Sequence, residues 1–220
     1  MNKTVHRIIL SALIWLIGST ALAVTVAVGN STESNNRISS DDTFNKIKTE
    51  LGSAVMVTFD ILITIESDIF DEIDSAYSEI YIANDSRYFA RLNDDIYLYD
   101  GDCIWEYSAA NNQATKRCPD EEEIVENRLA FIKNLDKYYT TTAIEKDSIY
   151  NLLKKTTDDE SLPDNMRIYL KNAHLSCIQY YDLNNDLNQV DILSETISDS
   201  LDVDIFKINL PDSVEVITLP

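Results

Sequence analysis

Glycine and histidine are scarce in this chain of 220 residues, which contains four glycines and two histidines. Loops that cradle phosphates need several closely spaced glycines, and many metal and acid–base sites use histidine. The sequence therefore lacks the raw material for most nucleotide-binding and metal-dependent enzyme motifs.

Positive charge is also in short supply. The chain has 18 Lys and Arg residues against 38 Asp and Glu, a formal net charge of −20. A strongly acidic chain repels phosphate, so nucleic acid is excluded as a partner. Hydrophobic residues make up 45% of the sequence. This fraction and the length are sufficient for one folded domain with its own core.

No catalytic or metal-binding constellation is present. The segment 182–188 begins like a calcium loop, but Leu187 occupies the position of the required Gly and Leu193 that of the bidentate Glu, so we interpret it as a turn. Cys177 and His174 are three residues apart on a predicted strand, where their side chains point to opposite faces. The acidic clusters fall in predicted turns and helix ends. We therefore expect no enzyme activity, no metal and no cofactor.

The N-terminus is typical of a secretory signal peptide. A short basic start precedes an apolar run over residues 8–17, and small residues lie two apart at Ala21 and Ala23. Cleavage after Ala23 is predicted, giving a signal peptide over 1–23, a flexible polar linker over 24–40 and an exported mature chain. The apolar character continues to Val28, so an uncleaved membrane anchor remains an alternative.

One domain is predicted over 41–220, beginning with a helix and a long strand. Phe44, Ile47 and Leu51 share one helical face, and Gly52 lies where that helix is expected to stop. Apolar residues then alternate strictly from residue 55 to 65, which indicates a strand with one buried face.

Further strands are expected over most of the remaining chain, with one interruption. A helix of four or five turns is predicted from Asp120, which can cap it, to about Lys137. The expected strands span residues 77–83, 87–92, 96–99, 103–108, 113–118, 148–155, 167–170, 174–183, 187–195 and 204–208.

A disulfide is predicted in one hairpin of this meander. If Ser108 pairs with Gln113, then Cys103 falls opposite Cys118 at a non-hydrogen-bonded position, where the two backbones approach most closely. Export makes such a bond chemically reasonable, and Cys177 is left as the odd cysteine. The alternative is that the two residues are small hydrophobic neighbours.

Two segments resemble a known family. The run Asp100-Gly-Asp-Cys-Ile-Trp-Glu-Tyr107, followed by Asn112-Gln-Ala-Thr115, is similar to the Asp-Gly-x-x-Leu-Trp-x-Tyr … Gln-Val-Thr hairpin of the periplasmic lipoprotein carriers, the LolA-like family. The stretch Phe206–Ile217 resembles the family's closing Phe-x-Phe-x-x-Pro-x-Gly-Val-x-Val segment. The turn Asn84-Asp-Ser86 departs from the pattern, because carriers usually have a basic residue before Pro there.

The resemblance implies a mostly β, α+β fold: a curved antiparallel sheet forming an unclosed β-barrel covered by short helices. It further implies a monomeric periplasmic chaperone that binds the acyl chains of lipoproteins in an apolar cavity. Such a carrier takes its cargo from an inner-membrane ABC exporter to an outer-membrane acceptor.

The predicted lining of this cavity comes from the inward positions of the strands and from the second helix. Its ten residues are Val57, Phe59, Ile61, Ile63, Ile80, Ile82, Leu98, Trp105, Ile132 and Leu135. Each could equally belong to an ordinary closed core. Two alternatives therefore remain: an exported lipid-binding or sensing module without transfer, and a structural interaction domain with a filled core.

Overall fold

A computed structural model describes residues 43–67, 72–120, 125, 128–155 and 162–219. The predicted signal peptide and linker lie outside these residues. Within the described segments, no helix is long and apolar enough to cross a membrane.

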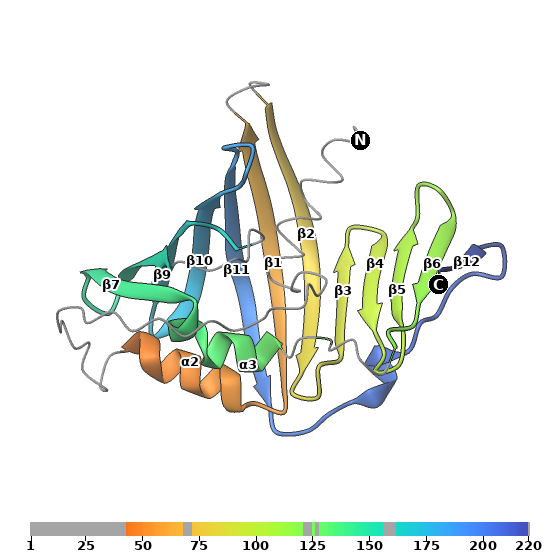
Figure 1. Cartoon of the computed structure of the whole chain (residues 1–220), viewed down its shortest axis with the longest axis horizontal. Coiled ribbons are helices and arrows are strands. Elements are labelled where there is room, and N and C mark those ends of the chain that lie inside the picture. Colours follow the sequence, from red (N-terminus) through yellow and green to blue (C-terminus); the bar gives the residue numbers. More distant parts are fainter. Residues whose placement is uncertain (1–42, 68–71, 121–124, 126–127, 156–161, 220) are drawn as a thin grey trace.

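The described chain is dominated by a single sheet of twelve strands (Figure 1). Its order is β12-β6-β5-β4-β3-β2-β1-β11-β10-β9-β8-β7, with β12 and β7 at separate edges. The predicted fold class, an unclosed and mostly β structure with short helices, is confirmed. The strands are β1 (Met56–Ser67), β2 (Glu72–Ala83), β3 (Tyr88–Leu92), β4 (Asp95–Tyr99), β5 (Ile104–Ser108), β6 (Gln113–Arg117), β7 (Tyr139–Glu145), β8 (Ile149–Lys154), β9 (Asn165–Lys171), β10 (His174–Tyr181), β11 (Leu187–Ser198) and β12 (Glu215–Leu219).

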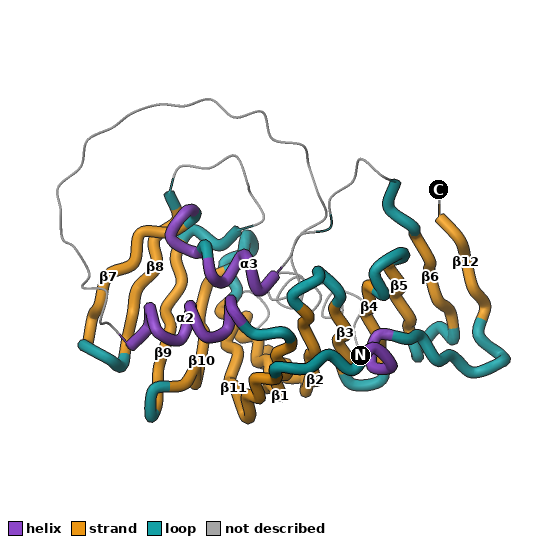
Figure 2. The backbone as a smooth tube through the Cα atoms, turned by 90° about the horizontal axis from the view of Figure 1, so that it is seen from below, coloured by secondary structure: helices purple, strands orange, loops and turns teal. Residues whose placement is uncertain are grey.

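The strand β1 lies near the centre of the sheet. It pairs antiparallel with β2 on one side and with β11 on the other. Its odd-numbered residues from 57 to 65 are buried on one face, which we call the concave face because the row of strands bends around it (Figure 2). One row on this face crosses six strands in register and consists of Tyr150, Ile168, Ile178, Val190, Ile63 and Ala76.

Two short helices lie over the concave face (Figure 2). In α2 (Thr43–Ser53), the apolar stripe predicted from the sequence is buried, and the Phe44 ring stacks on Tyr150 at 5.0 Å between centroids. The second helix, α3 (Arg128–Lys133), is shorter than predicted, because residue 125 is not helical and a 3₁₀ turn, η1 (Leu135–Lys137), follows. The remaining residues of the predicted start, 121–124 and 126–127, lie outside the described segments.

The opposite face carries a smaller apolar cluster under the C-terminal crossover. A strand was expected at 204–208, but the chain forms a 3₁₀ turn, η2 (Val203–Phe206), where the Asp202 side chain accepts a hydrogen bond from the Asp204 N–H. This local cap competes with extended pairing and places Phe206 against the sheet. The buried members of the cluster are Met56, Ala83, Phe89, Leu98 and Phe206.

The two edge strands of the sheet are β7 and β12. The strand β7 was not expected from the sequence. Only its first residue, Tyr139, is buried, and the residues that follow are polar or exposed. At the other edge, β12 runs parallel to β6, and its residues are exposed throughout. The crossover from β11 makes this parallel pairing possible.

Gly52 is required for close approach of the two helices. It lies inside α2, and a Cβ added there would overlap the Lys133 Cβ and lie 3.0 Å from the Lys133 Cα. The helix ends one residue later, at Ser53, as the sequence predicted, and Gly52 also allows the contact between α2 and α3.

We predict that Gly52→Ala destabilises the protein by about 1–3 kcal/mol, because α3 must move to admit the methyl group. Helix propensity alone would give the opposite sign, a gain of about 1 kcal/mol. Thermal unfolding of Gly52→Ala against Glu50→Ala, an exposed site on the same helix, measures the difference. A higher melting temperature for Gly52→Ala would contradict the close approach.

Candidate functional site

Eight of the ten predicted lining residues come together on the concave face. The four from β1 and the two from β2 are buried in one continuous cluster. Leu135 of η1 is buried in the same cluster, and Ile132 of α3 packs against it. The face and its covering helices therefore form one apolar unit, which we take as the candidate site.

Leu98 and Trp105 do not belong to this face. They are paired across β4 and β5, and Leu98 also pairs with Phe89, whose side chain lies on the opposite side from Ala90. Both residues pack in the cluster around Phe206. Their inclusion in the lining was wrong, because each tight turn of the meander resets which residues face inward.

The Asp100 carboxylate explains the sequence marker that includes Trp105. Its Oδ1 accepts hydrogen bonds from the N–H groups of Asp102 and Cys103, and its Oδ2 accepts from Trp105 Nε1 at 3.0 Å. Gly101 adopts a φ of +107°, which disfavours other residues. The Asp-Gly-x-x-x-Trp spacing is therefore a structural clamp on the convex side.

Much of the concave cluster comes from strands that were predicted from the sequence but were not predicted to line the site. These strands, β8 to β11, contribute buried residues to the concave cluster. Alternation in the segment Asn165–Lys171 was the available signal, since its burial follows period two. The added residues are Tyr150, Leu152, Met166, Ile168, Leu170, Ile178, Tyr180 and Val190.

Polar contacts hold α2 in place at two points. The Lys48 ammonium is almost buried and lies 2.7 Å from Asp136 Oδ2, which joins α2 to η1. At the start of α2, Thr43 donates from its N–H and its hydroxyl to Asp147 Oδ1 in the β7–β8 turn. The hydrogen bond from the Thr43 side chain lowers the pKa of Asp147.

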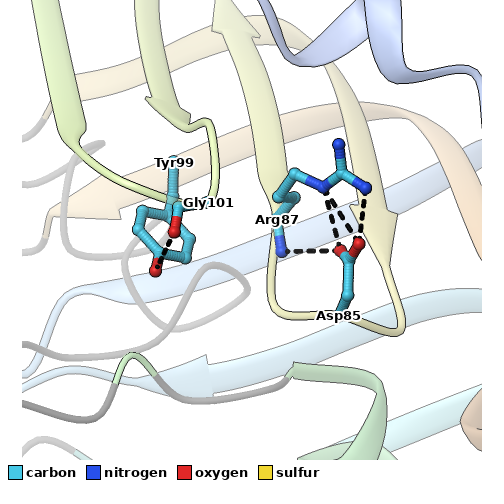
Figure 3. Close-up of polar contacts among 4 residues, drawn as sticks. All are labelled: Asp85, Arg87, Tyr99 and Gly101. Carbon is cyan, nitrogen blue, oxygen red and sulfur yellow. Dashed lines mark hydrogen bonds and ion pairs between the residues drawn. The ribbon is translucent and has the colours of Figure 1, made fainter.

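The turn between β2 and β3 is held by an ion pair. Arg87 donates through Nε and Nη2 to the Asp85 carboxylate (Figure 3). The guanidinium also lies over the Phe206 ring, 5.4 Å from its centroid. On the neighbouring loop, Tyr99 Oη donates to the Gly101 carbonyl at 2.8 Å. The basic side chain at this turn is thus engaged with the convex side.

The segment 182–188 forms the predicted turn between β10 and β11. Asp182 Oδ1 accepts hydrogen bonds from the N–H groups of Asn184 and Asp186. In the part of the chain that the structure describes, no group of three or more His, Cys, Asp or Glu side chains is arranged to hold a metal ion.

The hairpin has the predicted register, with Ser108 opposite Gln113. Cys103 and Cys118 are joined by a disulfide, with their Cα atoms 4.0 Å apart. Cys177 is free and half-buried, and burial, with Asp191 beside it, raises the pKa of its thiol to about 12.

Comparison with known proteins gives matches among solved structures alone. No family model matches the sequence, and no curated protein matches it. Similar structures include an uncharacterized conserved protein from Thermus thermophilus (8% identity, 80% of this chain and 97% of that one, TM-score 0.47). A putative outer membrane lipoprotein-sorting protein domain from Vibrio parahaemolyticus is another (8%, 74% and 94%, 0.40). A LolA superfamily protein from Nitrosomonas europaea also matches (9%, 76% and 96%, 0.39).

The unclosed sheet and its helical cover form the architecture that the sequence resemblance in the hairpin implies.

We predict one reactive thiol per chain after unfolding without reductant, because two of the three cysteines are bonded. In the folded protein Cys177 should react on the order of a thousandfold more slowly than a free cysteine near pH 8, since its raised pKa leaves little thiolate. Thiol titration measures both. Three thiols would rule out the disulfide, whose loss should cost about 3 kcal/mol.

We predict that Asp85→Asn weakens the acid dependence of stability. Hydrogen bonding to Arg87 lowers the pKa of Asp85 below its usual value of 3.8. Its contribution is therefore present above that value and is lost as the pH falls through the lower folded-state pKa. Melting temperatures from neutral pH down to about pH 2 should fall less steeply for Asp85→Asn than for Asp94→Asn. Equal slopes would contradict the role of the pair.

Proposed function

We propose that this protein is an exported, non-catalytic carrier that binds the acyl chains of lipoproteins on its concave face, beneath α2 and α3. The observation that carries the proposal is the extent of this face. Apolar side chains continue in register across six neighbouring strands, and the helices above them are short and anchored by a few polar contacts.

Binding an acyl chain requires a large apolar surface that the protein can also cover when no ligand is bound. Burying one CH₂ group contributes about 0.8 kcal/mol, so a sixteen-carbon chain needs apolar contacts worth about 12 kcal/mol. Ile61 and Ile63 are fully buried in the described state. An acyl chain therefore reaches them when the covering chain moves, and it replaces contacts that this chain otherwise makes.

Such an exchange needs no covalent step. The bound and closed states differ in what covers the concave face, so the helical layer acts as a two-state lid. It has few polar anchors: the almost buried Lys48 pairs with the largely exposed Asp136, and the exposed Thr43–Asp147 contact lies at the start of α2. Exposed contacts such as the second contribute little stability.

We place this carrier in the periplasm, between an inner-membrane ABC exporter and an outer-membrane acceptor. Cleavage after Ala23 would remove two basic residues and leave 16 − 38 = −22 charges. Anionic leaflets attract basic residues by about 1 kcal/mol each, so a protein of this charge is repelled by the membrane surface. A cargo-loaded carrier would then stay in solution between its partners.

A second candidate is a lipid-binding or sensing module that binds acyl chains without passing them on. The observation that favours it is the β2–β3 turn. The basic residue before Pro that lipoprotein carriers usually have is absent there, and Arg87 is occupied by Asp85 and Phe206. In this case the concave face would be the same but the handover would be missing.

We predict that Phe59→Ala and Ile132→Asp each lower the affinity for a fluorescent sixteen-carbon acyl probe by about tenfold or more, since both remove apolar contact on the concave face. Ile96→Ala, which trims the convex cluster, is the matched control and should bind normally. Circular dichroism shows that each variant is folded. Normal probe binding by folded Phe59→Ala and Ile132→Asp would overturn the proposed site.

Release of lipoprotein from inner-membrane vesicles separates the two candidates. A carrier withdraws lipoprotein into the soluble fraction, and the concave-face variants lose this ability with probe binding. A sensing module binds the probe and leaves the lipoprotein in the vesicles.

A further inference from the structure

Glu195 places a carboxylate among the apolar side chains of the concave face. It is the direct partner of Phe59 in the pairing of β1 with β11. The register shifts between Asp60 and Ile61, where Leu193 is the extra residue. Beyond this bulge, Ser194 faces the other side and donates to Asp60 Oδ2. Glu195 is thereby directed to the same face as Phe59.

The Glu195 carboxylate is buried but incompletely bonded. Its side chain is 9% exposed, and its Oε1 lies 3.4 Å from Nδ1 of the exposed His174. Its other oxygen, Oε2, is buried and has no hydrogen-bond partner within the described segments. A buried acceptor without a donor costs about 1–3 kcal/mol, and more when it is charged. An oxygen of this kind in a largely apolar surface can accept a hydrogen bond from a donor on a ligand.

A second polar atom lies on the same face across β1. Ser78 of β2 pairs with Ile61, and its hydroxyl is buried without a partner in the described chain. Glu195 and Ser78 therefore flank the central strand from its two neighbours, β11 and β2. One is an acceptor, and the other can donate or accept.

We propose that Glu195 and Ser78 form a polar subsite that recognises an N–H donor at the head of an acyl ligand and discriminates against a free carboxylate. The inference rests on the proposed acyl-binding function and names the ligand class. Glu195 accepts from the ligand N–H, while Ser78 donates to an acyl carbonyl. An ionised fatty acid would instead bring its carboxylate against that of Glu195. Hydrogen bonds to charged groups are strong enough to select ligands in this way.

Three sixteen-carbon probes test the subsite at neutral pH: N-methylhexadecanamide, hexadecylammonium and hexadecanoate. The wild-type protein is expected to bind the amide about tenfold more tightly than hexadecanoate. In Glu195→Gln, this ratio should fall to about one because the charge repulsion is removed. Ser78→Ala should weaken the amide several-fold and leave hexadecylammonium unchanged. Glu66→Gln, the same change on the other face of β1, serves as the control and should keep the wild-type ratio.

The two N–H probes distinguish the source of the donor. Tighter binding of the amide identifies an amide-linked acyl chain, and tighter binding of hexadecylammonium identifies an amino head group. The inference is overturned if Glu195→Gln keeps the wild-type ratio while acyl binding persists, because Glu195 would then be a hydrated structural group. If none of the probes binds the wild-type protein, the proposed function fails as well.

Discussion

The pairing of β1 with its two neighbours is the constraint on which the rest of the structure depends. Its two partners, β2 and β11, are also twelve residues long, so the three strands form a continuous central ribbon. A shift of one residue in either register would exchange the two faces. Such a slip would expose Ile61 and Ile63 and bury Asp60 in their place, so the hydrophobic pattern enforces one alignment.

Particular residues show which parts could be predicted from the sequence. The β1 strand and the Cys103–Cys118 hairpin were predictable, because strict alternation and turn geometry are local signals. The face on which Leu98 and Trp105 lie was not predictable. It depends on the number of residues in each turn between the paired strands. The orientation of Glu195 was not predictable either, because it follows from a β-bulge that has no local sequence signal.

The helix predicted at 120–137 is present in part, as α3, and its end differs from the prediction for a related reason. Amphipathic periodicity identified Ile132 and Leu135 as inward-facing, which is confirmed. Periodicity does not determine helix length, however, and the chain leaves the α-helix after Lys133 to form the 3₁₀ turn η1, which contains Asp136. That turn brings the Asp136 carboxylate to Lys48, so pairing with a second helix sets the boundary.

The two faces of the sheet are covered in different ways. The convex cluster is sealed by the chain that directly connects β11 to β12, through buried Phe206 and the Arg87 guanidinium above its ring. Uncovering it would require the β12 connection to detach. The concave face is covered by α2 and α3, whose mutual contact at Gly52 makes them one layer. That layer contains no strand of the sheet, so the lid movement proposed above would break no strand pairing.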